Sequence, residues 1–212
     1  MMTASATASN SATVFVIDDE IQARNSVCAL VQSMQFPSQP YESGESFLQG
    51  YDGQPGCVVC DYRMAGMNGL ELQDKLAASG YDIPIIIVTA YARTAVTVQA
   101  IQKGAVTMLD KPYSEDDLWG AIREGLAIDE QRREAKAKRA DIETRIASLN
   151  DKERQVLDLI VAGQPNKAMA NKLDVSLRTI ENRRRTVFSK LGAQTVAELV
   201  ALVLKQQGSN VQ

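Results

Sequence analysis

Histidine is absent from all 212 residues of this sequence. Histidine is the side chain that most often serves as a general base or a metal ligand near neutral pH. Its absence excludes histidine-dependent catalysis, histidine metal sites and a phosphohistidine within this chain. A reaction that needs an imidazole group therefore requires a partner molecule that supplies it.

Cysteines and long apolar runs are also scarce. The three cysteines are too few for a disulfide scaffold, and Cys57 and Cys60 would point to opposite faces of a strand because their spacing is odd. No apolar run reaches the roughly 18 residues of a membrane helix, and the N-terminal stretch lacks the pattern of a signal peptide. We expect a cytoplasmic protein that has no membrane partner.

Charge is divided unevenly along the chain. Residues 1–128 have a net charge of −8, whereas residues 151–205 have a net charge of +4. A chain of this length forms one or two domains, and the opposite charges indicate two domains with different partners. The basic domain is a candidate for binding nucleic acid.

The first half alternates short apolar runs with amphipathic segments, which is typical of a doubly wound parallel sheet. Strands are expected near 14–17, 39–41, 57–60, 84–88 and 106–109, each followed by a helix. Four of these runs lead into polar residues, which are Asp18 with Asp19, Asp61, Thr89, and Lys111. These side chains should meet, because ligand sites in such sheets lie at the carboxyl ends of the strands.

The polar residues at the strand ends predict phosphoryl chemistry. Clustered carboxylates repel one another unless a hard cation neutralises them, and ligands that are all oxygen favour Mg²⁺. The Thr89 hydroxyl and the Lys111 ammonium can bind phosphoryl oxygens. An aspartate can itself attack phosphorus, so we interpret the group as an aspartyl-phosphate site.

Four motifs support this interpretation: Val16-Ile17-Asp18-Asp19-Glu20, Asp61-Tyr62-Arg63-Met64 with Met67-Asn68-Gly69, Thr89-Ala90, and Lys111-Pro112. With this spacing, residues 13–128 resemble the receiver domain of two-component response regulators. The resemblance implies that Asp61 is the phosphoacceptor and that Thr89 and Lys111 contact the phosphoryl group. It further implies a Mg²⁺ site formed by Asp18, Asp19, Asp61 and the Arg63 backbone carbonyl, and a cis peptide before Pro112.

The chain departs from the receiver pattern at two positions. Ala65 stands where the family usually has proline, so the loop after the phosphoacceptor should be less rigid. Met108 stands where most members have a switch tyrosine or phenylalanine, so the usual movement of an aromatic ring does not carry over. Two interpretations remain open for Tyr91 and Tyr113, which are either half-exposed loop residues or parts of a switch.

A charged stretch without proline joins the two halves. Residues 114–149 should form one long helix, which is either a solvated spacer or a helix that pairs in a dimer. Four helices should follow. The first is capped by Asn150 and the second by Asn166, the third spans 177–191 and the fourth spans 195–205.

The second and third of these helices form a helix-turn-helix pattern whose third helix is strongly basic. With Lys152-Glu153, Asn166-Lys167, Val175-Ser176, Thr179-Ile180-Glu181 and Lys190-Leu191, residues 145–205 resemble the LuxR/NarL/FixJ helix-turn-helix. The resemblance implies base contacts from Glu181, Asn182 and Arg185. Phosphate contacts are expected from Asn166, Lys167, Arg178, Thr179 and Arg184. The resemblance also implies that the fourth helix is a dimer surface. Alternatively, part of the apolar stripe on this helix packs against its own domain.

We therefore expect a response regulator of the FixJ/NarL type that is not an enzyme beyond promoting its own phosphorylation and dephosphorylation. Its parts would be a disordered N-terminus (1–12), a receiver domain (13–128), a helical linker (129–147), a helix-turn-helix domain (148–206) and a flexible tail (207–212). A sensor histidine kinase would phosphorylate Asp61 with Mg²⁺, and phosphorylation would drive homodimerisation and binding to double-stranded DNA half-sites. The alternative is a regulator that binds DNA constitutively and uses its receiver only as a dimerisation scaffold.

Overall fold

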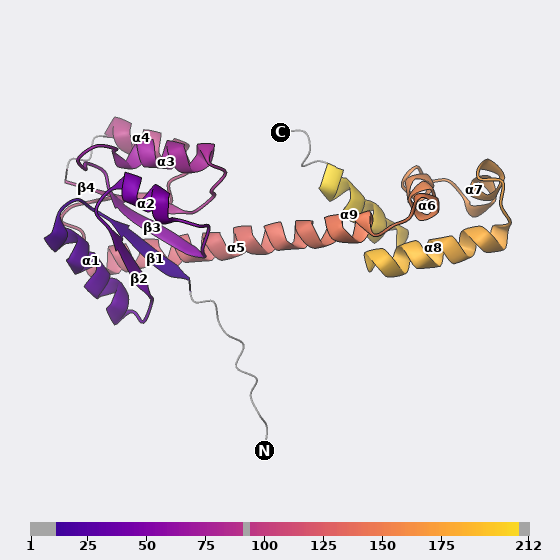
Figure 1. The fold of residues 1–212 in the computed structure, drawn as a ribbon, viewed down its shortest axis with the longest axis horizontal. Helices are drawn as coiled ribbons and strands as arrows, with labels where there is room; N and C mark the ends of the chain where they lie inside the picture. Colours follow the sequence, from indigo (N-terminus) through magenta and orange to yellow (C-terminus); the bar gives the residue numbers. More distant parts are fainter. Residues whose placement is uncertain (1–11, 91–93, 208–212) are drawn as a thin grey trace, which may run out of the picture. The chain divides into compact units, whose positions relative to one another are not determined.

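Five parallel strands form the centre of the first of two compact units, which are divided between Arg133 and Glu134. The strands lie in the order β2-β1-β3-β4-β5 (Figure 1). Their bounds are Thr13–Ile17, Ser38–Tyr41, Gly56–Asp61, Ile85–Thr89 and Thr107–Asp110 for β1 to β5. This is the flavodoxin-like order of a doubly wound sheet, and it confirms the predicted fold of the first half.

The structure is a computed structural model that describes residues 12–90 and 94–207. The disorder predicted for residues 1–12 and 207–212 concerns residues that lie almost entirely outside this range. Tyr91, for which two interpretations were open, also lies outside it. The domain boundaries inferred from the sequence stay a prediction.

Helices cover both faces of the sheet: α2, α3 and α4 lie on one face, and α1 and α5 on the other (Figure 1). The five helices are Ile21–Ser33, Gly44–Gly50, Gly69–Ala78, Thr94–Gln102 and Glu115–Ala147 for α1 to α5. Alternate residues of β3 serve the two faces, since Cys57 packs with Leu118 and Ile122 of α5, and Cys60 packs in the other core cluster. The two thiols therefore do not converge, as their spacing predicts. Each fully buried Val, Leu or Ile contributes roughly 1.5–3 kcal/mol.

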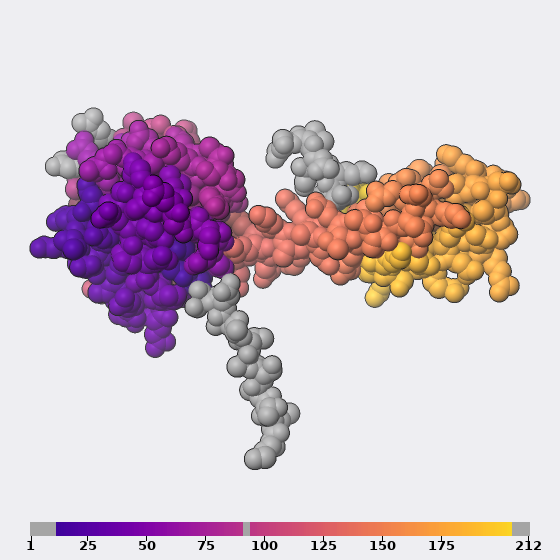
Figure 2. All heavy atoms as spheres, viewed as in Figure 1, coloured from indigo at the N-terminus to yellow at the C-terminus, as the bar shows by residue number. Residues whose placement is uncertain are grey.

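Helix α5 is fixed to the sheet along its first turns. Gly125 allows a close approach, because a Cβ there would lie 3.1 Å from the Cys57 Cβ. One turn further on, the buried Asp129 accepts a hydrogen bond from the Gly56 N–H at 2.9 Å. The helix then continues as a solvated segment. Residues 134–141 are exposed, as the face of the segment shown in Figure 2 illustrates.

The second unit is helical. After the end of α5 it contains α6 (Asp151–Val161), α7 (Asn166–Lys172), α8 (Leu177–Leu191) and α9 (Val196–Gln207). Its core includes Val156, Met169, Ile180, Val187 and Leu199, all fully buried. No single helix in the described ranges is long and apolar enough to span a membrane, and α8 and α9 meet that test only as a pair bent by 57°.

Asn150 caps α6 as predicted, and its side chain accepts a hydrogen bond from the Glu153 N–H. The prediction that Asn166 caps α7 was wrong, since Asn166 is the first helical residue and Pro165 occupies the cap. The proline ring fixes φ and leaves Pro165 extended (φ −71°, ψ 154°), while its carbonyl accepts the first helical bond, from the Met169 N–H. Proline therefore begins this helix without a capping side chain.

Candidate functional site

Asp61 is the last residue of β3, and its carboxylate is held by two donors. The side chain is largely buried, with the residue 8% exposed. One carboxylate oxygen accepts a hydrogen bond from the Lys111 ammonium at 2.6 Å, and the other accepts one from the Arg63 N–H at 2.7 Å. A buried carboxylate is stable only when charge or hydrogen bonds compensate it, and Asp61 has both.

Lys111 joins Asp61 to Asp18. Asp18 follows β1, is 4% exposed, and accepts a hydrogen bond from Lys111 at 3.2 Å. Burial by itself would lower the pKa of Lys111, but the hydrogen bonds and negative charges of Asp61 and Asp18 outweigh it and raise the pKa above its usual range. The peptide between Lys111 and Pro112 is cis, as the resemblance implied. One ammonium group thus contacts two buried carboxylates and offsets part of their negative charge.

Thr89 ends β4 next to these groups. Strand pairing aligns Asp61 with Val88, so Thr89 lies one residue beyond the partner of the aspartate. Its backbone carbonyl accepts a hydrogen bond from the Lys111 N–H at 2.7 Å, and Thr89 is 1% exposed. The sheet therefore brings Asp18, Asp61, Thr89 and Lys111 to one edge.

Asp19 has a different role from Asp18 in this structure. It is exposed, and its carboxylate accepts a hydrogen bond from the Ala65 N–H at 2.8 Å. Within residues 12–90 and 94–207, no three acidic or cysteine side chains converge as metal ligands would. The donor set still suits Mg²⁺, because every predicted ligand atom is an oxygen and two carboxylates already share one cation. The predicted ligand set remains a prediction.

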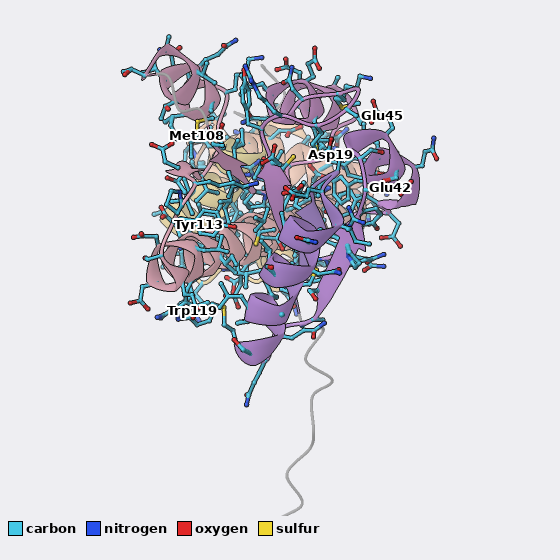
Figure 3. The ribbon with its side chains drawn as sticks, turned by 90° about the vertical axis from the view of Figure 1, so that its left-hand side faces the viewer. Asp19, Glu42, Glu45, Met108, Tyr113 and Trp119 are labelled. Atoms are coloured by element: carbon cyan, nitrogen blue, oxygen red, sulfur yellow. The ribbon has the colours of Figure 1, made fainter. Side chains whose placement is uncertain are left out.

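The switch position is occupied by a thioether. Met108 lies in β5, and its sulfur accepts a hydrogen bond from the Thr97 hydroxyl of α4 at 3.4 Å. Tyr113 is partly buried against the α1 and α5 face of the sheet, where burial raises its pKa. Figure 3 shows Met108 and Tyr113 on the same side of Asp19. The sequence shows that position 108 has no aromatic ring, but it does not show that Met108 has a partner on the preceding helix, α4.

Glu45 is a residue of this region that the sequence did not single out. It lies in the first turn of α2, and its carboxylate accepts a hydrogen bond from the Met67 N–H at 3.2 Å. No motif of the sequence connects these two residues, which are 22 positions apart. The only indication was the helix expected after the strand near 39–41.

The second unit presents α8 to solvent. The Ser176 side chain caps α8 by accepting from the Thr179 N–H, and Ile180, Val187 and Leu191 anchor the helix in the core. The opposite face exposes the three predicted base-reading residues, Glu181, Asn182 and Arg185. Their i, i+1, i+4 spacing places them on one side of the helix.

The predicted phosphate contacts differ in exposure. Arg178 and Lys167 are exposed, whereas Asn166 and Thr179 are partly buried. The Arg184 guanidinium lies 5.6 Å from the centre of the Phe188 ring, so part of this side chain is packed on its own helix. The Thr179 hydroxyl lies 2.8 Å from that of Ser176, at the helix cap.

Two families match the chain, one in each half. "Response regulator receiver domain" matches residues 14–123, and "Bacterial regulatory proteins, luxR family" matches residues 147–203. The transcriptional regulatory protein TdiR of Thauera aromatica is 36% identical over 200 residues, covering 92% of this chain and 87% of that protein. FixJ of Bradyrhizobium diazoefficiens is 36% identical over 193 residues, covering 91% and 94%.

Solved structures show the same two-part architecture. The response regulator StyR is 37% identical with a TM-score of 0.83, covering 92% of this chain and 99% of that one. Full-length FixJ from B. japonicum is 35% identical with a TM-score of 0.55, covering 92% and 97%. Both domains predicted from the sequence are thus confirmed. The chain belongs to the response regulators that combine a receiver domain with a luxR-type DNA-binding domain, and it is a transcriptional regulator.

Proposed function

We propose that Asp61 accepts a phosphoryl group from a sensor histidine kinase and that this modification controls DNA binding. The observation that carries the proposal is the placement of a buried nucleophile beside a cation. The Asp61 carboxylate lies 2.6 Å from the Lys111 ammonium, at the edge of the sheet where Thr89 ends β4 and Asp18 follows β1. The chain has no histidine, so a phosphohistidine donor has to be on a partner.

In the transfer, one Asp61 oxygen forms a bond to phosphorus as the phosphorus–nitrogen bond of the partner's phosphohistidine breaks. The electron pair of that bond stays with the imidazole nitrogen. Lys111 pairs with one phosphoryl oxygen, and the Thr89 hydroxyl donates to another. The Arg63 N–H fixes the orientation of the attacking carboxylate at 2.7 Å.

Asp18, Asp19, Asp61 and the Arg63 carbonyl would hold Mg²⁺ in this proposal. When bound, the cation neutralises the carboxylates and the phosphoryl oxygens. For Asp19 to serve as a ligand, the cation would bind its second carboxylate oxygen or displace the Ala65 N–H, which is bonded to the first in this structure. Lys111 likewise has to share Asp18 and Asp61 with the cation.

For the second unit we propose that α8 enters the major groove. Asn182 would read adenine, Arg185 guanine and Glu181 the amino group of cytosine. The phosphate contacts Asn166, Lys167, Arg178, Thr179 and Arg184 would fix the register without specifying sequence. Pairing of two chains after phosphorylation would match two DNA half-sites, and α9 offers the exposed apolar residues Val196 and Leu204 for that pairing.

The test compares oligomeric state and DNA affinity at fixed salt with Mg²⁺, before and after addition of beryllofluoride, which mimics the aspartyl phosphate. We expect a shift to dimer and tighter binding to a specific site, measured by light scattering and fluorescence anisotropy. Asp61→Asn should show no shift. If the wild type binds DNA equally well in both states, the receiver is a scaffold and the constitutive alternative holds.

A further inference from the structure

The loop that follows the phosphoacceptor is held by carboxylates from three elements. Every second backbone N–H group from residue 63 to residue 67 donates a hydrogen bond to one of these carboxylates. The pairs are Arg63 to Asp61 at 2.7 Å, Ala65 to Asp19 at 2.8 Å and Met67 to Glu45 at 3.2 Å. These bonds fix residues 63–67 at both ends and in the middle. They tie the backbone of the loop to its surroundings at three points, although the loop has alanine and not proline at position 65.

The third of these contacts belongs to a close fit against the first turn of α2. The Met67 side chain is 4% exposed, and a Cβ on Gly44 would lie only 3.1 Å from its sulfur. Gly66 has φ +86°, and a Cβ there would lie 3.0 Å from the Glu45 carboxylate. The absence of a side chain at Gly44 thus leaves room for the Met67 side chain, and Glu45 binds the Met67 backbone next to it.

The three carboxylates differ in what the proposed reaction requires of them. Asp61 is the nucleophile, and Asp19 is a proposed ligand of the cation as well as the acceptor of the Ala65 N–H. Glu45 lies outside the group of predicted ligands, on the side of Asp19 away from Met108 and Tyr113 (Figure 3). It is thus the carboxylate that holds the loop without being needed for the cation or for the transfer itself.

We propose that Glu45 is a positioning residue for phosphorylation of Asp61. Its bond to Met67 holds the far end of the loop whose first amide, that of Arg63, orients the Asp61 carboxylate. Small displacements of a reacting group reduce rates strongly. This inference rests on the proposed function, because it assigns a role within that reaction.

The experiment measures phosphorylation by acetyl phosphate with Mg²⁺ in the full chain, and amide hydrogen exchange at Met67 without metal or donor. Glu45→Ala should lower the maximal rate about three- to tenfold, the effect of one hydrogen bond, and should speed exchange at Met67. Glu45→Gln keeps an oxygen acceptor and should restore both. Glu42→Ala is the matched control, because Glu42 is exposed on the same side (Figure 3) and has no hydrogen bond within the described residues.

Equal rates and equal Met67 exchange in wild type and Glu45→Ala would overturn the proposal, and so would a loss in Glu45→Gln as large as that in Glu45→Ala. If wild type itself takes no phosphoryl group, the proposed function fails. The exchange measurement, which needs neither metal nor donor, then still decides whether Glu45 holds the loop. The two failures are therefore distinguishable.

Discussion

At the scale of single residues, Ala65 donates the hydrogen bond that Asp19, a proposed Mg²⁺ ligand, accepts in this structure. An alanine has the backbone N–H that a proline lacks, and this N–H donates to Asp19 at 2.8 Å. Ala65→Pro should remove the competing bond and tighten Mg²⁺ binding by about tenfold, the value of one charge-assisted hydrogen bond at a partly exposed site. Isothermal titration calorimetry with Mg²⁺ alone measures this change without phosphorylation.

The control for this residue is Ala65→Ser, which changes the side chain but keeps the N–H, and it should bind Mg²⁺ as the wild type does. An unchanged dissociation constant in Ala65→Pro would mean that the Asp19 bond costs nothing to break. A weaker affinity would mean that the loop, rather than the bond, limits access to the cation.

At the scale of elements, an ion pair ties α6 to α8 in the DNA-binding unit. Glu153 is 7% exposed and lies 2.6 Å from the Lys190 ammonium. The hydrogen bond from Lys190, helped by that from the Asn150 N–H, lowers the pKa of Glu153 below its ordinary value of 4.5. Because the folded state favours the charged form, the stabilisation is complete above pH 4.5 and is lost as the pH falls through the lowered pKa.

Glu153→Gln should therefore lower the urea midpoint of the helical unit at pH 7. The difference from wild type should shrink as the pH falls below 4.5 and vanish below the lowered pKa of Glu153. Amide signals of α6 and α8, followed by NMR during urea titration, report on this unit alone. Asp151→Asn is the control, since Asp151 is an exposed acid in the same first turn. A difference that persists unchanged at acid pH would show that the lost charge is not the cause.

The elements themselves could be predicted from the sequence more fully than their contacts. Runs such as Val14–Ile17 and Ile85–Val88 are apolar on both faces, so strand type and sheet class follow from the pattern alone. The prediction of Asn166 as the cap of α7 was wrong because Asn166 and Pro165 are both residue types that suit a helix start. Only the backbone conformation shows that Pro165 is the extended residue before the helix. The Glu45–Met67 bond could not be predicted, because it depends on how the first turn of α2 meets the loop after β3.

The candidate site shows the same division. Asp18, Asp61, Thr89 and Lys111 could be predicted because each is the last residue of a strand or the residue just after it, and parallel strands bring their ends together. The sequence could not predict that Lys111 bridges Asp18 and Asp61 or that Asp19 accepts from the Ala65 N–H. These contacts depend on side-chain conformations, which residue spacing does not determine. Likewise, the exposed face of α8 follows from its period of 3.6 residues, but the packing of Arg184 on Phe188 does not.

At the scale of the whole molecule, an acidic receiver is joined to a basic DNA-binding unit, with net charges of −8 for residues 1–128 and +4 for residues 151–205. The chain as a whole carries −3, so its attraction to DNA depends on a local cluster of positive charge. Binding should therefore weaken steeply with salt through the phosphate contacts, whereas base contacts should set the sequence preference.

Two exposed residues, Asn182 and Lys167, separate these contributions in the beryllofluoride-treated chain. Asn182→Ala should weaken binding to a site selected from random DNA by about 1–3 kcal/mol and leave non-specific binding unchanged. Lys167→Ala should weaken both kinds of binding and reduce the slope of log affinity against log salt by about 1. Fluorescence anisotropy at several salt concentrations measures both effects.

Lys172→Ala is the charge-matched control, because Lys172 is exposed at the other end of α7 and is not a predicted contact. It should change the salt slope less than Lys167→Ala does. Should Asn182→Ala weaken specific and non-specific DNA equally, α8 would contact the backbone rather than the bases. The sequence preference would then have to come from DNA shape, because no base edge would be read by this helix.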